Sequence, residues 1–156
     1  MNYEHTQRSP LHLILFAVAA ALLIGAWLIR QQPPAVGLLI LAAIFALLGL
    51  MFGCLTVRDE GQWLALRYGP LSMFRKRIAY DRITSVEAGR ISVLDGWGIH
   101  YVPGRGMTYN LWGFGCVKLT LGRKVVRVGT DDAENLADFL QGKIAEREAD
   151  CQNLRL

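Results

Sequence analysis

Residues 11–55 decide the architecture of this chain, and they read LHLILFAVAAALLIGAWLIRQQPPAVGLLILAAIFALLGLMFGCL. The stretch holds two uncharged runs, residues 11–29 and residues 35–55, and its only formal charge is Arg30. A helix rises about 1.5 Å per residue, so each run is long enough to cross the hydrocarbon core of a bilayer. Lipid offers no partner for a free backbone N–H or C=O, so both runs are expected to be transmembrane helices.

The connection between the two runs is short and polar. It reads Arg30-Gln31-Gln32-Pro33-Pro34, and neither proline can continue a preceding helix. So short a link predicts an antiparallel helical hairpin over residues 11–55. Gly49 and Gly53 form a GxxxG pair in the second run, which allows close helix packing within the hairpin or between subunits.

Basic residues near the ends of the helices predict the orientation of the hairpin. The connection carries only Arg30, whereas five Lys or Arg residues lie between positions 58 and 77. This asymmetry places the domain after the hairpin in the cytoplasm, together with an N-terminal tail of residues 1–10. The sequence therefore predicts a multi-pass protein with two spans in the plasma (inner) membrane and both termini cytoplasmic.

The residue pattern after the hairpin is typical of a water-facing β domain. Residues 63–68 alternate and end at Gly69-Pro70, and short β-rich runs follow at 77–80 and 83–87. Residues 117–121 and 125–128 read as a β-hairpin. Strands that recur at this spacing favour a small barrel or sandwich.

One amphipathic helix is expected to follow the strands, over residues 131–147. Leu136, Leu140 and Ile144 recur at four-residue spacing, and Asp131 with Glu134 has the spacing of a capping box. Such a helix would close the open end of a curled sheet. Residues 148–156 then form a polar C-terminal tail.

Residues 55 to about 147 resemble the bacterial pleckstrin-homology-like (PH-like) family, in its small membrane-tethered form. The resemblance implies an α+β membrane protein in which residues 56–147 form about seven strands in two near-orthogonal sheets, capped by the C-terminal helix. It covers roughly three-fifths of the chain, and none of its motifs is a catalytic signature. The matching stretches are Tyr80-Asp81-Arg82-Ile83-Thr84-Ser85-Val86, Gly96-Trp97-Gly98-Ile99-His100-Tyr101, Tyr109-Asn110 and Val128-Gly129-Thr130-Asp131-Asp132.

Two segments are candidate contact sites. The first joins apolar and cationic residues, as a loop at the lipid headgroup boundary would, although a solvated strand edge has the same composition. The second is rich in glycine and aromatic residues, which suits either an interaction loop or the turns and core of a curled sheet. The first contains Leu71, Met73, Phe74, Arg75, Lys76 and Arg77, and the second contains Gly96, Trp97, Gly98, Tyr109, Asn110 and Trp112.

The charge of +4 is unevenly distributed. Residues 58–130 hold 12 basic and 5 acidic side chains, whereas residues 131–156 hold 3 basic and 7 acidic ones. A basic β region beside a bilayer meets anionic headgroups first. No aromatic RNA-binding signature or DNA-reading helix accompanies the basic residues, so nucleic acid is not an expected partner.

The titratable residues do not predict catalysis or a cofactor. His5, His12 and His100 fall in a tail, a membrane segment and a strand, without metal-ligand spacing. The three cysteines are odd in number and form no CxxC motif. Neither a metal site nor another cofactor is therefore expected.

The sequence favours a non-enzymatic membrane scaffold that recruits a protein partner or another copy of itself through sheet edges or aromatic loops. The alternative is a module that binds or senses anionic lipid headgroups through its basic β region. An enzyme is a third and less favoured interpretation.

Overall fold

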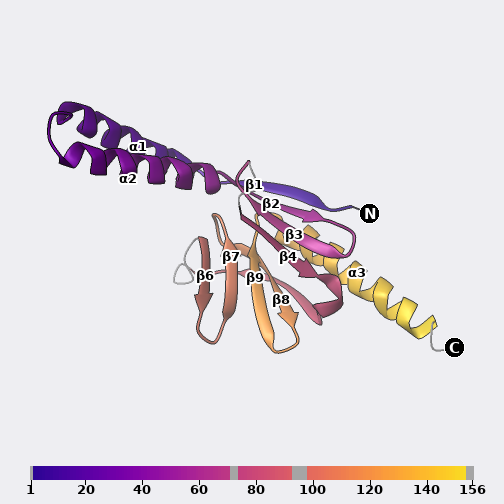
Figure 1. Cartoon of the computed structure of the whole chain (residues 1–156). Coiled ribbons are helices and arrows are strands. Elements are labelled where there is room, and N and C mark those ends of the chain that lie inside the picture. Colours follow the sequence, from indigo (N-terminus) through magenta and orange to yellow (C-terminus); the bar gives the residue numbers. More distant parts are fainter. Residues whose placement is uncertain (1, 71–73, 93–97, 154–156) are drawn as a thin grey trace.

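A computed structural model describes residues 2–70, 74–92 and 98–153, and it shows an α+β protein with a long helical hairpin (Figure 1). The described elements are, in order, β1 (Glu4–Arg8), α1 (Leu11–Leu28), α2 (Pro34–Met51), β2 (Cys54–Asp59), β3 (Trp63–Tyr68), β4 (Phe74–Ala79), a 3-10 turn (Tyr80–Arg82), β5 (Ser85–Arg90), β6 (Gly98–Val102), β7 (Gly106–Asn110), β8 (Gly115–Leu121), β9 (Lys124–Gly129) and α3 (Ala133–Asn153).

The hairpin projects from the β domain, while the C-terminal end of α3 projects on the opposite side (Figure 1). Both α1 and α2 are long and apolar enough to cross a membrane, with mean hydropathies of 2.4 and 2.5. Their large side chains remain uncovered by protein: Trp27 is 64% exposed and Val36 is 63% exposed. An apolar surface of this extent is unfavourable in water.

The two hairpin helices pack through small residues. Ala35, Ala42 and Gly49 are the buried residues of α2, and Ala19 and Ala26 are the buried residues of α1. Both sets repeat at intervals of seven residues, as expected for two helices in close lengthwise contact. α2 ends at Met51, earlier than the expected residue 55, and Cys54 and Leu55 already belong to β2.

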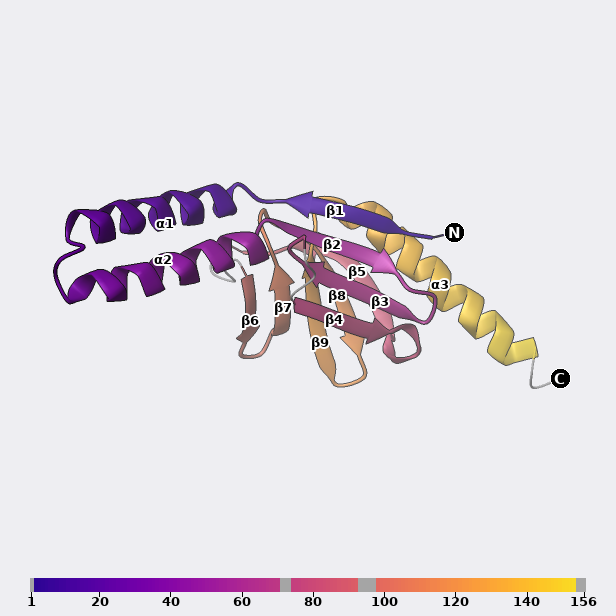
Figure 2. The same ribbon diagram turned by 45° about the horizontal axis from the view of Figure 1, so that its top comes forward.

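The first sheet continues the hairpin directly. Its order is β1-β2-β3-β4, and all its pairings are antiparallel (Figure 2). β1 leads into α1, and α2 leads into β2, so the pairing of Arg8 with Cys54 joins the two helices at their base. The expectation of a tail over residues 1–10 is therefore wrong, because residues 4–8 form an edge strand.

The second sheet has the order β5-β8-β9-β7-β6. The predicted hairpin is present as β8 and β9, which pair from Cys116 with Gly129 to Leu121 with Lys124. β7 and β9 are parallel, and the other pairings are antiparallel. The described residues of the domain expected at 56–147 thus contribute eight strands, β2 to β9, rather than about seven, and β1 adds a ninth. The strands form two separate sheets, and no pairing among the described residues closes them into a barrel.

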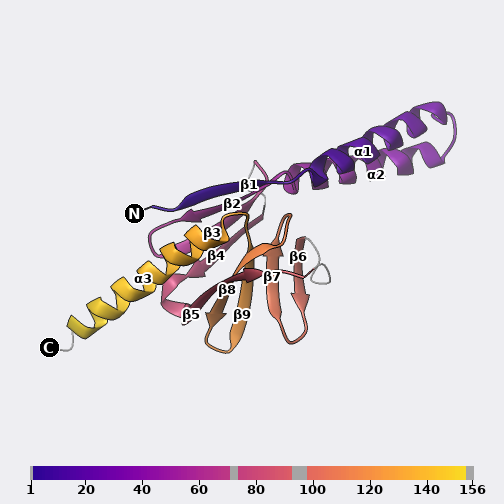
Figure 3. The ribbon, with the colours of Figure 1, turned by 180° about the vertical axis from the view of Figure 1, so that it is seen from behind.

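The core lies between the two sheets, and α3 covers its open end (Figure 3). Leu64, Leu66 and Tyr68 face this core from β3, as their alternation predicted. Leu136 and Leu140 enter it from α3. The helix begins at Ala133, and residues 148–153, expected to be part of a polar tail, extend it to Asn153. Side chains from both sheets and from α3 therefore form one core.

Candidate functional site

A groove with basic walls runs between the last strand of the first sheet and the face of the second sheet. Its volume is about 590 Å³, which lies within the range of about 300–1,000 Å³ typical of ligand sites. We call it the cationic groove. It is lined by Trp63, Lys76, Arg77, Ile78, Ala79, Arg82, Met107, Tyr109, Leu121, Arg123, Lys124 and Val126.

The cationic groove has an apolar floor and a charged rim. Ile78, Tyr109 and Val126 are buried and form the floor. The rim consists of exposed residues, namely Trp63, Lys76, Arg77, Arg82, Arg123 and Lys124. Five of the lining side chains are cationic and none carries a carboxylate. The lining therefore suits a ligand that is anionic at its edges and apolar where it meets the floor.

Only one of the rim cations is neutralised by a carboxylate in the described part of the chain. Arg77 Nε donates to Glu60 Oε2 at 2.8 Å, and Arg67 binds the other oxygen of Glu60. The hydrogen bond from Arg67, aided by the charge of Arg77, holds the pKa of Glu60 below its usual range. No ion pair within the described ranges involves the other four cations, which are Lys76, Arg82, Arg123 and Lys124.

β4 borders the cationic groove as an edge strand. Four consecutive residues of the strand, 76–79, line the groove, so both faces of the strand and its free edge border it. At the start of β4 the Phe74 ring stacks on the Tyr109 ring of β7, with centroids 6.5 Å apart. This contact lies at the end of β4 nearer the hairpin, where Phe74 pairs with Tyr68.

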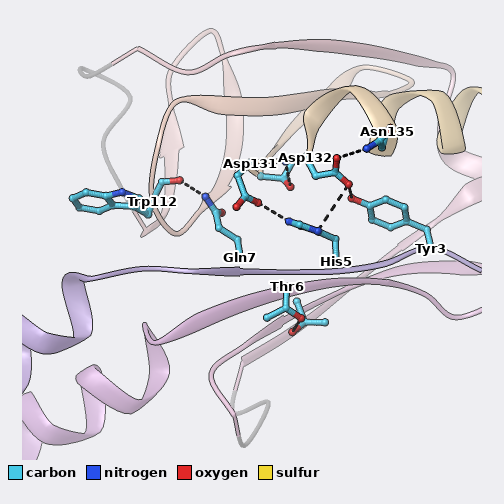
Figure 4. Close-up of polar contacts among 10 residues, drawn as sticks. Tyr3, His5, Thr6, Gln7, Trp112, Asp131, Asp132 and Asn135 are labelled. Carbon is cyan, nitrogen blue, oxygen red and sulfur yellow. Dashed lines mark hydrogen bonds and ion pairs between the residues drawn. The ribbon is translucent and has the colours of Figure 1, made fainter.

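A second cluster of polar side chains ties β1 to the start of α3 (Figure 4). His5 Nε2 lies 2.6 Å from Asp131 Oδ1, and the Tyr3 hydroxyl donates to Asp132 Oδ2 at 3.0 Å. Gln7 Nε2 donates to the carbonyl of Trp112 at 2.7 Å. Burial, together with the hydrogen bond to Asp132, raises the pKa of Tyr3. These contacts fasten the N-terminal segment to the β7–β8 connection and to the residues just before α3.

The start of α3 differs from the expected capping box. Asp131 lies outside the helix and contacts His5, while the Oδ1 of Asp132, the residue before the helix, accepts from the Asn135 side-chain Nδ2 at 2.6 Å. The carboxylates of Asp131 and Asp132 are thus bound to residues of the chain itself.

The predicted basic and apolar segment is divided by the fold. Leu71 and Met73 lie outside the described residues. Phe74 is half-buried against the core, whereas Arg75, Lys76 and Arg77 are exposed on β4. Of these three cations, Lys76 and Arg77 line the cationic groove. Arg75 pairs across the sheet with Arg67, at the end of β4 near the hairpin.

The predicted glycine and aromatic segment is not gathered into one described loop. Gly96 and Trp97 lie outside the described residues, and Gly98 begins β6 near the Phe52 ring. Tyr109 is buried in the groove floor, and Asn110 is fully buried at the end of β7. Trp112 follows β7 and is half-buried against the core. The described members therefore fill the interior, which is the structural alternative that the sequence left open.

The two glycines of the hairpin have different surroundings. A Cβ atom at Gly49 would lie 2.8 Å from the Phe16 ring of α1, so Gly49 sits in the contact between the helices. Gly53 follows the end of α2, and its carbonyl accepts a hydrogen bond from the Ser9 N–H. The repeat of Ala35 and Ala42 with Gly49 is the sequence signal that best locates the packing face.

Most of the groove residues were not candidates from the sequence. Arg82 lies in the 3-10 turn, Arg123 in the β8–β9 turn and Lys124 at the start of β9, and no local motif links them. Among the described residues, no group of three or more His, Cys, Asp and Glu side chains is placed to hold a metal ion.

No model of a known protein family matches the chain, and no curated protein is similar to it. Membership of the PH-like family is therefore a proposal that rests on the residues of this chain.

Proposed function

We propose that this protein is a non-enzymatic, PH-like scaffold that recruits a protein partner to the cytoplasmic face of the plasma membrane. The α1–α2 hairpin crosses the bilayer and the β domain is the recruiting part. The PH-like assignment is supported by two sheets that enclose a core and by a C-terminal helix that covers its open end.

The observation that carries this proposal is the direct continuation of the hairpin into the first sheet. Both helices join paired strands, and β1 is fastened to α3 by His5 and Tyr3. The β domain is thus held at a fixed position on the hairpin rather than on a flexible linker. A domain presented in this way keeps its cationic groove at a constant distance from the bilayer, which suits a binding surface.

The cytoplasmic orientation is supported by the positive charges near the base of the hairpin. Arg8 pairs with Cys54 beside the helices, and Arg58, Arg67 and Arg75 lie further along the same sheet. Arg30 alone marks the other end. Basic residues are retained on the cytoplasmic side of membrane helices.

Two measurements on the full-length protein test the anchor. The protein is expected to stay in the membrane fraction after a carbonate wash, and a cytoplasm-active reporter fused after Leu156 is expected to be active. Release by carbonate would contradict the anchor, and activity of an exported reporter instead would contradict the orientation.

Photo-crosslinking in intact membranes tests the recruitment. A photoreactive residue is placed, one at a time, at Trp63 in the groove rim, Thr6 on the outer face of the first sheet and Glu134 on α3, all of which are exposed. We expect at least one position to yield a discrete adduct with one protein. Adducts with lipid alone from every position would overturn the proposal.

Anionic lipid is the second candidate ligand, and the position of Arg8 and Arg75 favours it. Arg8 lies three residues before α1, and Arg75 lies at the hairpin end of β4. Each basic residue close to an anionic bilayer contributes about 1 kcal/mol of attraction. The lipid test uses the full chain in nanodiscs, because a fragment beginning at residue 56 would lack β1 and part of β2.

Native mass spectrometry of the nanodisc-derived protein provides the measurement for lipid. Retention of phosphatidylserine over phosphatidylcholine, reduced in Arg8→Ala with Arg75→Ala, would support lipid binding. Equal retention of the two lipids would exclude it.

A further inference from the structure

We infer that the cationic groove binds an acidic, extended segment of the partner protein, which adds as a strand to the free edge of β4. This inference rests on the proposed recruitment function, and it names the site and the chemistry of the partner. It is carried by three features of the groove, namely the backbone edge, the charged rim and the apolar floor.

Within the described residues, no strand pairs with the outer edge of β4, so its outward backbone groups face the groove without a strand partner. The Tyr80 N–H donates to the Gln62 carbonyl, so Gln62 and Tyr80 form a hydrogen-bonded pair in the β3–β4 register. Such pairs alternate along an antiparallel ladder. The backbone groups of Arg75, Arg77 and Ala79 therefore point away from β3, toward the open edge. An exposed edge of this kind accepts an extended peptide by strand addition.

The charges select an acidic segment. Lys76 and Arg82 lie on the β4 side of the groove, and across it Arg123 lies in the β8–β9 turn and Lys124 begins β9. None of these four side chains has a carboxylate partner in the portion of the chain that is described. A strand between the two sides would place its acidic side chains within reach of both.

The apolar floor determines how the acidic residues are spaced. Ile78, Tyr109 and Val126 form a buried surface beneath the rim. Successive side chains of a strand point to opposite faces. The partner segment therefore alternates acidic residues, which meet the rim, with apolar residues, which meet the floor.

The same surface continues beyond the groove. A neighbouring cavity of about 490 Å³ shares Met107, Arg123, Lys124 and Val126 with it and reaches Tyr101 and Arg105 at the β6–β7 turn. The cationic surface beside a strand bound along β4 thus extends across the second sheet toward the β6–β7 turn.

The test uses the full-length protein in phosphatidylcholine nanodiscs, with fluorescence anisotropy as the measurement. The probe is a labelled short peptide of alternating glutamate and valine, and a lysine–valine peptide of equal length is its control. We expect saturable binding of the acidic probe alone. Arg123→Glu combined with Lys124→Glu is expected to weaken binding by about tenfold or more, because two attractive charges become repulsive.

A matched variant controls for net charge. Arg58→Glu combined with Arg90→Glu makes the same change in charge outside the groove, on β2 and β5. It is expected to retain the affinity of the wild type within about twofold, since exposed charges at a distance are screened. Equal losses in the two double variants would show general charge attraction and would overturn the inference.

Ala79→Pro tests strand addition separately from charge. Ala79 already has φ −73° and ψ 133°, so proline fits the backbone there. The substitution removes one outward N–H and leaves every side-chain charge in place. We expect a loss of at least about threefold in probe affinity, as for one lost hydrogen bond. Unchanged affinity would show that the peptide does not pair with β4.

Further outcomes separate this inference from the recruitment function. Binding of soluble short-chain phosphatidylserine in place of the acidic peptide would overturn the inference in favour of a lipid headgroup. If a crosslinked partner remains bound to the Arg123→Glu/Lys124→Glu variant, recruitment stands and the groove is excluded as its site. If no surface position yields a protein adduct, recruitment itself fails.

Discussion

His5 Nε2 and Asp131 Oδ1 lie 2.6 Å apart although 126 positions separate the two residues in the sequence. The contact joins the strand before the first hairpin helix to the segment that begins the last helix. Together with the neighbouring Tyr3–Asp132 hydrogen bond, it makes the N-terminal segment part of the β domain. The domain therefore lies on both sides of the hairpin in sequence, and the hairpin is an insertion between β1 and β2.

A double-mutant cycle on Tyr3 and Asp132 measures this connection. Tyr3→Phe removes the donor and Asp132→Ala removes the acceptor, and the cycle cancels whatever else each substitution costs by itself. We expect a coupling energy of about 0.5–1.5 kcal/mol, the usual contribution of one hydrogen bond. The measurement is the free energy of unfolding in detergent. Strictly additive effects of the two changes would show that the bond contributes nothing.

Acid is expected to weaken the β2–β4 part of the first sheet through Glu60. Because the pKa of Glu60 is lowered in the fold, its contribution is present above the ordinary value of 4.5 and is lost as the pH falls through the lowered value. Thermal unfolding followed over this acidic range should therefore show a falling midpoint, and Glu60→Gln should flatten that dependence.

Glu148→Gln is the control for the acid experiment. Glu148 is exposed on α3 and has no ion pair within the described ranges. The control variant should keep the wild-type profile. An acid profile of Glu60→Gln that matches the wild type would contradict the role given to Glu60.

Of the two glycines in α2, Gly49 is expected to tolerate a larger side chain less well than Gly37. A Cβ at Gly49 would meet the Phe16 ring at 2.8 Å, whereas nothing lies within 4 Å of a Cβ at Gly37. Gly49→Leu should therefore destabilise the detergent-solubilised protein by about 1–3 kcal/mol through overpacking. Gly37→Leu is its matched control and should cause no such loss. Similar midpoints for both variants would mean that the helices do not pack at Gly49.

Two further glycines should respond to alanine with opposite signs. Gly106 has φ +90°, and a Cβ there would lie 2.1 Å from the Val125 carbonyl oxygen, so Gly106→Ala should cost at least about 2 kcal/mol. Gly142 lies in α3 with open space around it, so Gly142→Ala should stabilise by roughly 0.5–1 kcal/mol. Chemical unfolding of each variant provides the comparison.

Local residue patterns were sufficient to predict the helices and strands whose pattern lies within one continuous stretch of sequence. The two apolar runs predicted α1 and α2, the alternation of Leu64, Leu66 and Tyr68 predicted the inward face of β3, and the four-residue spacing of Leu136 and Leu140 predicted α3. β1 carries too few apolar residues to show such a pattern. Its partners are β2, beyond the hairpin, and the start of α3, so its pairing could not be found locally.

The sequence by itself determined that two helices too apolar for water precede a β domain with a basic first part and an acidic end. This follows because hydropathy and periodicity are properties of neighbouring residues. Only the tertiary structure decided that Lys76, Arg82, Arg123 and Lys124 surround one groove while Arg75 lies apart. Their proximity comes from the way the edge of one sheet meets the face of another, and no spacing along the chain encodes that geometry.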